Sequence, residues 1–187
     1  MIRSLRAFDQ DRIAKLDLRM WRAYYGHNFA RLFFLLVALV RVQFGLNYVR
    51  AVQAAFLAAS AAIDFRINKG HEDQAKILRK LTRFSKLVSE YSLERFDFKK
   101  VAELELNWWF IDRYPERYPS GAREEGLREA MAAMYRIDPE RLNDYARYRA
   151  AAMVLQDEAE KRGEPVDWER IAELLKHSYA SLYEAVK

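Results

Sequence analysis

Two acidic residues occupy matching places in two similar segments of the chain. The segment FDQDRIAKLDLRMW covers residues 8–21, and FDFKKVAELELNWW covers residues 96–109, so that Asp17 corresponds to Glu105. Each acid precedes a tryptophan by four residues, a spacing that places the two side chains on one flank of a helix. If such carboxyl groups come together, one pKa rises, or their oxygens form a metal site.

The same acids also have a structural interpretation, which we prefer. Half-buried carboxylates on helices are usually satisfied locally. Each acid could accept an indole hydrogen or pair with an arginine such as Arg50 or Arg141. If the acids line a ligand pocket instead, the aromatic side chains nearby form its wall: Trp21, Tyr24, Trp108 and Trp109.

Histidines offer little further chemistry. A ferritin-like di-iron centre needs Glu-x-x-His twice, and no glutamate stands three residues before any of the three histidines. Glu173 and His177 share a helix face at i, i+4 and are a weak candidate for one metal ion, although a simple surface pair is the preferred interpretation. His177 could also assist Asp17 and Glu105 in an acid–base set.

Motifs for other catalytic classes are missing from the sequence. The chain has no cysteine, which excludes thiol catalysis, disulfides and Cys-ligated zinc. It also contains no G-x-S-x-G elbow, no phosphate-binding P-loop and no dinucleotide fingerprint. We therefore expect no cofactor and favour a protein without catalytic activity.

One helical segment carries a basic strip at spacings of three and four residues. Such a strip could bind nucleic-acid phosphates or acidic lipid head groups. A solvated charged face is the preferred interpretation, because no recognition-helix pattern accompanies it. The strip consists of Lys76, Arg79, Lys80, Arg83 and Lys86.

The composition predicts an all-α fold. Ala, Leu, Arg and Glu are abundant and there is a single threonine, so helix is favoured over strand. Apolar periodicity and N-cap residues place eight helices along the chain. Their predicted ranges are 10–25, 29–44, 48–67, 72–92, 98–113, 122–136, 139–162 and 167–186.

The repeated segment predicts an internal duplication. Six of the fourteen aligned residues are identical, whereas about one would match by chance. Asp9 and Asp97 both stand at an N-cap position, each after a phenylalanine. We expect two repeats of four helices, residues 1–94 and 95–187, related by a pseudo-twofold axis and fused into one helical bundle.

Charge and hydrophobicity differ between the halves. Residues 1–101 hold 19 Lys/Arg against 9 Asp/Glu, and residues 102–187 hold 13 against 18. The helices at 29–44 and 48–67 are apolar nearly all round, and the second is rich in alanine, which is typical of a buried helix or an oligomer interface. The apolar run at 32–40 is shorter than the roughly 20 residues of a membrane span. With no signal peptide at the N-terminus, we expect a cytoplasmic protein.

The function favoured by the sequence alone is a binding or assembly module that forms homo-oligomers. An acidic protein or ligand is a possible partner of the basic half. The alternative is a small-ligand-binding protein or hydrolytic enzyme with a pocket between the repeats that uses Asp17 and Glu105. A third interpretation, nucleic-acid association through the basic half, is disfavoured.

Overall fold

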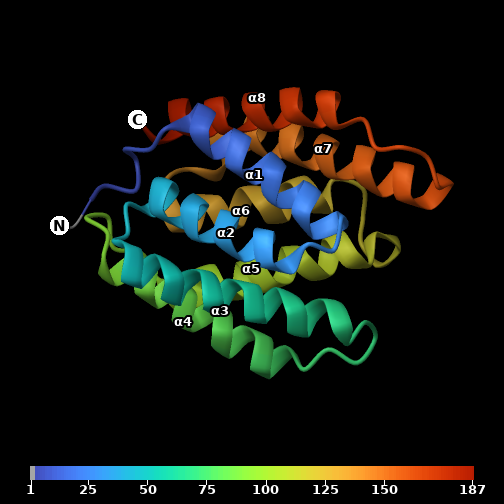
Figure 1. The fold of residues 1–187 in the computed structure, drawn as a ribbon. Coiled ribbons are helices and arrows are strands. Elements are labelled where there is room, and N and C mark those ends of the chain that lie inside the picture. The colour runs from blue at the N-terminus through green and yellow to red at the C-terminus, as the bar shows by residue number, and fades with distance from the viewer. Residues whose placement is uncertain (1–2) are drawn as a thin grey trace.

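The computed structural model describes residues 3–187, and this range forms eight α-helices and two short 3-10 helices (Figure 1). It contains no β-strand apart from an isolated bridge between Arg3 and Ser92, so the predicted all-α class is confirmed. The α-helices are α1 (Gln10–Tyr25), α2 (Phe29–Phe44), α3 (Tyr48–Ile67), α4 (Gln74–Glu90), α5 (Phe98–Arg113), α6 (Ala122–Tyr135), α7 (Asn143–Arg162) and α8 (Trp168–Val186).

Side-chain caps explain why the helices begin where the sequence predicts. Asp9 accepts a hydrogen bond from the amide of Arg12, and Asp97 accepts from the amides of Lys99 and Lys100. Each cap satisfies an amide that has no partner inside the helix, which is worth about 1 kcal/mol. Four further helices begin in the same way, after Asn28, Asn47, Asp73 and Asp167.

The largest difference from the predicted boundaries is at the start of α7. Residues Pro139–Leu142 form a separate 3-10 helix, η2, and α7 begins only at Asn143. Asp138 caps η2 by accepting a hydrogen bond from the amide of Glu140. The N-cap signal at Asp138 is therefore genuine, but it starts one tight turn and not the long helix. The other 3-10 helix, η1, is Pro115–Arg117.

The helices close into a ring in chain order. Each α-helix packs against the next one along the chain, and α8 returns to pack against α1. In Figure 1 α1 lies beside α8, and α1 begins at the end of the molecule where α8 ends. Because the ring is closed, one face of every helix points towards a common interior.

Small residues bring α3 close to its neighbours. Ala51, Ala54, Ala55 and Ala61 are completely buried, and side chains of this size allow helices to approach closely. The chain turns by 117° between α2 and α3. The two helices are therefore far from antiparallel and splay apart from the turn that joins them.

The outer faces of α2 and α3 remain strongly apolar. No single helix among the described residues is long and apolar enough to cross a bilayer, and α2 with α3 would meet such a criterion only as a sharply bent pair. Of the ten large apolar or aromatic side chains that are most exposed, seven lie on these two helices. We call them the α2–α3 surface: Phe29, Phe34, Tyr48, Val49, Phe56, Ile63 and Ile67.

Candidate functional site

A cavity of about 610 Å³ lies between the helices of the ring. Every one of the eight α-helices contributes side chains to its lining. The lining divides by chemistry into two parts. The polar wall comes from α1, α5, α7 and α8 and contains Asp17, Glu105, Asp112, Tyr145, Arg149, Asp157 and Tyr179.

The opposite part of the lining, the apolar wall, comes mainly from α2, α3 and α6. Leucine, phenylalanine and methionine side chains dominate it, and the methionines add a flexible, polarizable surface that adapts to ligand shape. A cavity with a large apolar wall and a few placed polar groups is typical of a small-molecule site. Its members include Leu32, Phe33, Leu36, Phe56, Ile63, Met131 and Met134.

Asp17 is the most deeply buried charge of the polar wall. Its side chain is 1% exposed, and its Oδ2 lies 2.7 Å from Nη1 of Arg149. The hydroxyl of Tyr179 donates a second hydrogen bond to the same oxygen, at 2.9 Å. The other carboxylate oxygen, Oδ1, is buried and has no hydrogen-bond partner among the described residues. A buried acceptor in this state favours a ligand that can donate a hydrogen bond to it.

Arg149 reaches Asp17 from α7, 132 residues away in the sequence. Its guanidinium also lies 5.7 Å from the ring of Trp21 and 5.8 Å from that of Tyr179. Aromatic faces stabilise a cation at such distances. The predicted pairing of an acid with Arg50 or Arg141 is wrong for Asp17, because α7 supplies the arginine from across the ring.

Glu105 is held by two tryptophans of its own helix. Nε1 of Trp108 donates to Oε2 at 2.8 Å, and Nε1 of Trp109 donates to Oε1 at 3.0 Å. Burial raises the pKa of Glu105 above its ordinary value, and the indole hydrogen bonds oppose this rise only in part. The predicted indole–carboxylate contact is thus present, with both tryptophans engaged at once.

A third acidic group lies near the C-terminal end of α5. Asp112 Oδ1 is 2.9 Å from Nε of Arg123, and Nη2 of the same arginine is 2.8 Å from Oδ2 of Asp157. Burial raises the pKa of Asp112 to about 6, although Arg123 opposes the rise. Two acids therefore share one arginine at this end of the polar wall.

The structure brings most of the predicted pocket residues to one cavity. Asp17 and Glu105 both line it, without a direct contact between them, and both feel the charge of Arg149. The four predicted aromatic residues line the same cavity: Trp21, Tyr24, Trp108 and Trp109.

His177 and Glu173 lie elsewhere. His177 is exposed on α8 and stacks on the ring of Tyr148 at 5.2 Å, so the structure does not bring it to the acids. Glu173 is also exposed and pairs with Arg170 at 2.8 Å. Among residues 3–187 no group of three or more His, Cys, Asp or Glu side chains could hold a metal ion.

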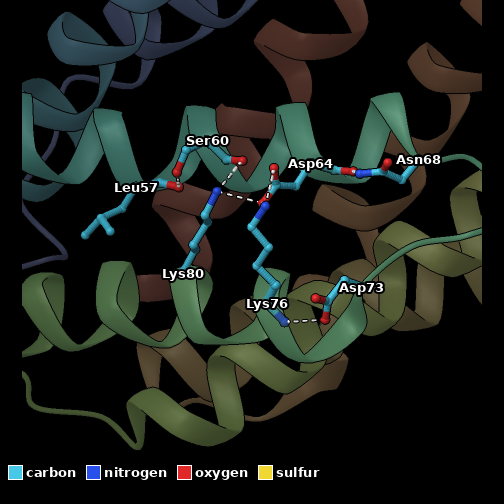
Figure 2. A network of polar contacts seen from close by, with 7 residues as sticks. All are labelled: Leu57, Ser60, Asp64, Asn68, Asp73, Lys76 and Lys80. Atoms are coloured by element: carbon cyan, nitrogen blue, oxygen red, sulfur yellow. Dashed lines mark hydrogen bonds and ion pairs between the residues drawn. The ribbon is translucent and has the colours of Figure 1, made fainter.

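The predicted basic strip is only partly available to a partner. Figure 2 shows Lys76 and Lys80 of α4 directed at Asp64 of α3, with distances of 3.1 Å and 2.7 Å to Oδ2. Lys80 also donates to the backbone oxygen of Ser60. Arg79, Arg83 and Lys86 are exposed, and Lys86 lies 3.7 Å from Glu90.

Sequence reasoning missed the partners that come from the second half of the chain. Arg149 and Tyr179 carry no local signal, because their roles depend on α7 and α8 closing the ring against α1. A weak signal existed for Asp112, which follows Glu105 by seven residues and so shares its helix flank. The apolar wall was visible only as two unusually apolar helices.

The polar wall consists mostly of hydrogen-bond acceptors. Four carboxyl groups line the cavity, against the two arginines Arg66 and Arg149. Arg149 is already bonded to Asp17, so the geometry favours a ligand group that donates hydrogen bonds over one that carries negative charge. No protein-family model matches the chain, and neither a curated protein nor a solved structure matches it.

Proposed function

We propose that the protein binds a small amphiphilic molecule inside the helical ring, with a hydrogen-bond-donating head at the polar wall and an apolar tail along the apolar wall. One observation carries this proposal: the cavity is lined by Asp17, whose buried Oδ1 has no hydrogen-bond partner among the described residues, and by an extended apolar surface. The sequence alone favours an assembly module, and the cavity reverses that preference.

The head group follows from the charges around Asp17. An alcohol or amine can donate a hydrogen bond to Oδ1, whereas a carboxylate would add a negative charge beside Asp17 and Glu105. The raised pKa of Glu105 already indicates that this region disfavours further negative charge. Binding an amine would favour the ionised form of Glu105 and lower its pKa.

The tail follows from the shape of the lining. Side chains on α2 and α3 extend the cavity from the buried acids to the protein surface at Phe29, Phe56 and Ile63, which line it and remain 43–64% exposed. An apolar tail along this path would leave water, the main favourable term in binding.

Dye displacement tests the proposal. Nile red, an apolar dye that fluoresces in nonpolar surroundings, should bind with one-to-one stoichiometry. Decan-1-ol and decylamine should displace it at concentrations at least tenfold lower than decanoate, because only the first two carry a donating head without negative charge. Absence of dye binding, or displacement that is best with decanoate, would contradict the proposal.

A blocking variant provides the control. Ala59 lines the cavity on α3, whereas Gln53 is exposed on the same helix outside the lining. Ala59→Trp should reduce dye affinity at least tenfold, and Gln53→Trp should leave it unchanged. If Ala59→Trp also lowers the melting temperature, Ile63→Trp at the exposed mouth takes its place.

We also propose that the two halves, residues 1–94 and 95–187, arose by duplication and are related by a pseudo-twofold axis. Support comes from the repeated segment, from the matching caps Asp9 and Asp97, and from the junctions α4–α5 and α8–α1, which recur four helices apart. A circular permutant that begins at Phe96 should then fold and melt within a few degrees of the parent. A permutant that does not fold would contradict equivalent halves.

A further inference from the structure

We propose that the α2–α3 surface and the basic strip beside it dock on a bilayer that contains anionic lipid, so that the cavity mouth opens towards the lipid. Docking through this surface does not depend on ligand binding in the cavity. Loading of the cavity from the bilayer does, and it rests on the proposed function. Three observations meet on one side of the molecule: exposed apolar side chains, cations and the mouth of the cavity.

The apolar stripe on α3 has the pattern of a helix that lies in a membrane interface. Val49, Phe56, Ile63 and Ile67 recur at spacings of seven, seven and four residues, and they are 43–73% exposed. On α2, Phe34 is 68% exposed. Helices that lie in the headgroup region bury such a face and keep cations at its border.

Positive charge exceeds negative charge on the helices that carry this stripe. Together α2 and α3 carry four arginines and a single acid, Asp64. That acid is bonded to Lys76 and Lys80 of α4, as Figure 2 shows, so two amines share one carboxylate beside α3 and leave a net positive charge there. Asp64 follows Ile63 directly, which places this basic edge next to the apolar stripe. Anionic head groups attract cations held at the edge of an inserted apolar face.

The cavity mouth lies within the same surface. Phe56 and Ile63 belong both to the exposed stripe and to the cavity lining. A bilayer in contact with the stripe would therefore cover the mouth, and an amphiphile could pass between α2 and α3 without crossing water. The exposed stripe and the cavity mouth share these residues. A bilayer makes use of both features, whereas a protein partner that binds a flat apolar patch would use only the stripe.

Charge also argues against a second copy of the chain as the occupant. A symmetric dimer through this surface would bring together two copies of the same face, each with an excess of arginine over acid, and an excess of like charge on both sides opposes association. Nucleic acid would suit the cations, but it offers nothing to the exposed aliphatic side chains.

Vesicle flotation tests the proposal. The full-length protein should float with phosphatidylcholine vesicles that contain phosphatidylglycerol, and at least tenfold less with phosphatidylcholine alone. Phe34, Val49 and Ile67 lie outside the cavity lining, so Phe34→Ser/Val49→Ser/Ile67→Ser should reduce flotation at least tenfold while Nile red still binds without vesicles. The control Leu93→Ser/Val154→Ser changes exposed residues of other faces and should float normally.

Charge reversal provides the second arm. Arg79→Glu/Arg83→Glu should reduce flotation severalfold and weaken its dependence on salt, whereas Lys161→Glu/Lys176→Glu on the outer sides of α7 and α8 should have little effect. Equal flotation on both vesicle types, no flotation of the parent, or unchanged flotation of the serine variant would overturn the proposal. So would a dimer that the serine variant dissociates, or binding to duplex DNA that resists the serine changes.

The two proposals fail separately. Loss of vesicle binding with intact dye binding removes the docking surface and leaves the cavity. Loss of dye binding with intact flotation removes the cavity and leaves the docking surface.

Discussion

The second and third helices of the ring differ in character from the sixth and seventh. Seven large apolar side chains on α2 and α3 are exposed, whereas on α6 and α7 Val154 alone belongs to this group among the described residues. In turn α7 carries Arg149 and Asp157 into the polar wall. The α2–α3 pair therefore opens the cavity to the surface, whereas α7 supplies two of the charges in its polar wall.

Packing follows the same division. The close approach of α6 to α5 depends on Gly126, because a Cβ at this position would lie 2.8 Å from Cβ of Trp108. By contrast the chain turns by 117° between α2 and α3. Tight packing at α5–α6 fixes the position of Trp108, which donates to Glu105, whereas α2 and α3 meet at a wide angle and carry the exposed edge of the cavity.

The largest expected effect comes from the buried charge that α7 supplies. Arg149→Met leaves Asp17 buried without its cation, which should destabilise the fold by about 3–5 kcal/mol. Arg147→Met removes an exposed ion pair with Asp144 on the same helix and should change stability little. Urea unfolding of both variants measures the difference. Equal losses would show that the Asp17–Arg149 pair is no more important than a surface pair.

The next largest effect is the difference in stability cost between a substitution on the packed face of α3 and one on its cavity-lining face. Ala54 is completely buried, so Ala54→Leu should cost about 1–3 kcal/mol through overpacking. Ala59→Leu projects into the cavity and should cost less than about 1 kcal/mol. Urea unfolding and Nile red titration are the measurements. A large stability loss at Ala59 would mean that no open space lies beside it.

A smaller effect depends on pH and concerns Asp112. Its folded pKa, about 6, exceeds the ordinary value of 3.8, so the folded state holds the proton more tightly. Stability from this group is complete below pH 3.8 and is lost as the pH rises through 6. Asp112→Asn should remove this pH-dependent loss of stability. The loss should be of order 1 kcal/mol, because solvent partly screens the carboxyl group.

Unfolding curves at pH 4 and pH 7 measure this change. The parent should lose stability relative to Asp112→Asn between the two values. A constant difference between the two proteins would show that Asp112 titrates as an ordinary exposed carboxyl.

The smallest effect on stability is expected at the α2–α3 surface. Phe34→Ser/Val49→Ser/Ile67→Ser changes side chains that are 65–73% exposed, so each position should alter the free energy of unfolding by less than about 0.5 kcal/mol. Urea unfolding checks this. A loss of several kcal/mol would mean that these side chains pack in the folded chain, and the surface would no longer be available for docking.

Much of the fold could be predicted from the sequence because its signals are local. Asp9, Asn47, Asp97 and Asp167 cap their helices through contacts within three residues, and apolar periodicity extends each helix from there. The start of α7 was misplaced because Pro139 suits the first turn of either helix type. Ring closure joins residues from opposite ends of the chain, and no local pattern encodes it.

The site was predictable only where its signals are also local. The repeated Asp17 and Glu105, each near tryptophan, identified the cavity-lining flanks of α1 and α5. Arg149 and Tyr179 could not be found, since any arginine or tyrosine of the second half has the same local pattern. The accessible side of α2 and α3 was equally hidden, because helices that are apolar all round have no hydrophobic face that stands out.

The most direct measurement is a crystal structure of the protein with decan-1-ol. We predict that the hydroxyl lies within hydrogen-bond distance of Asp17 Oδ1 and that the alkyl chain runs between α2 and α3 towards Phe56. A packed cavity without ligand, or decan-1-ol found only on the outer face of α3, would contradict it.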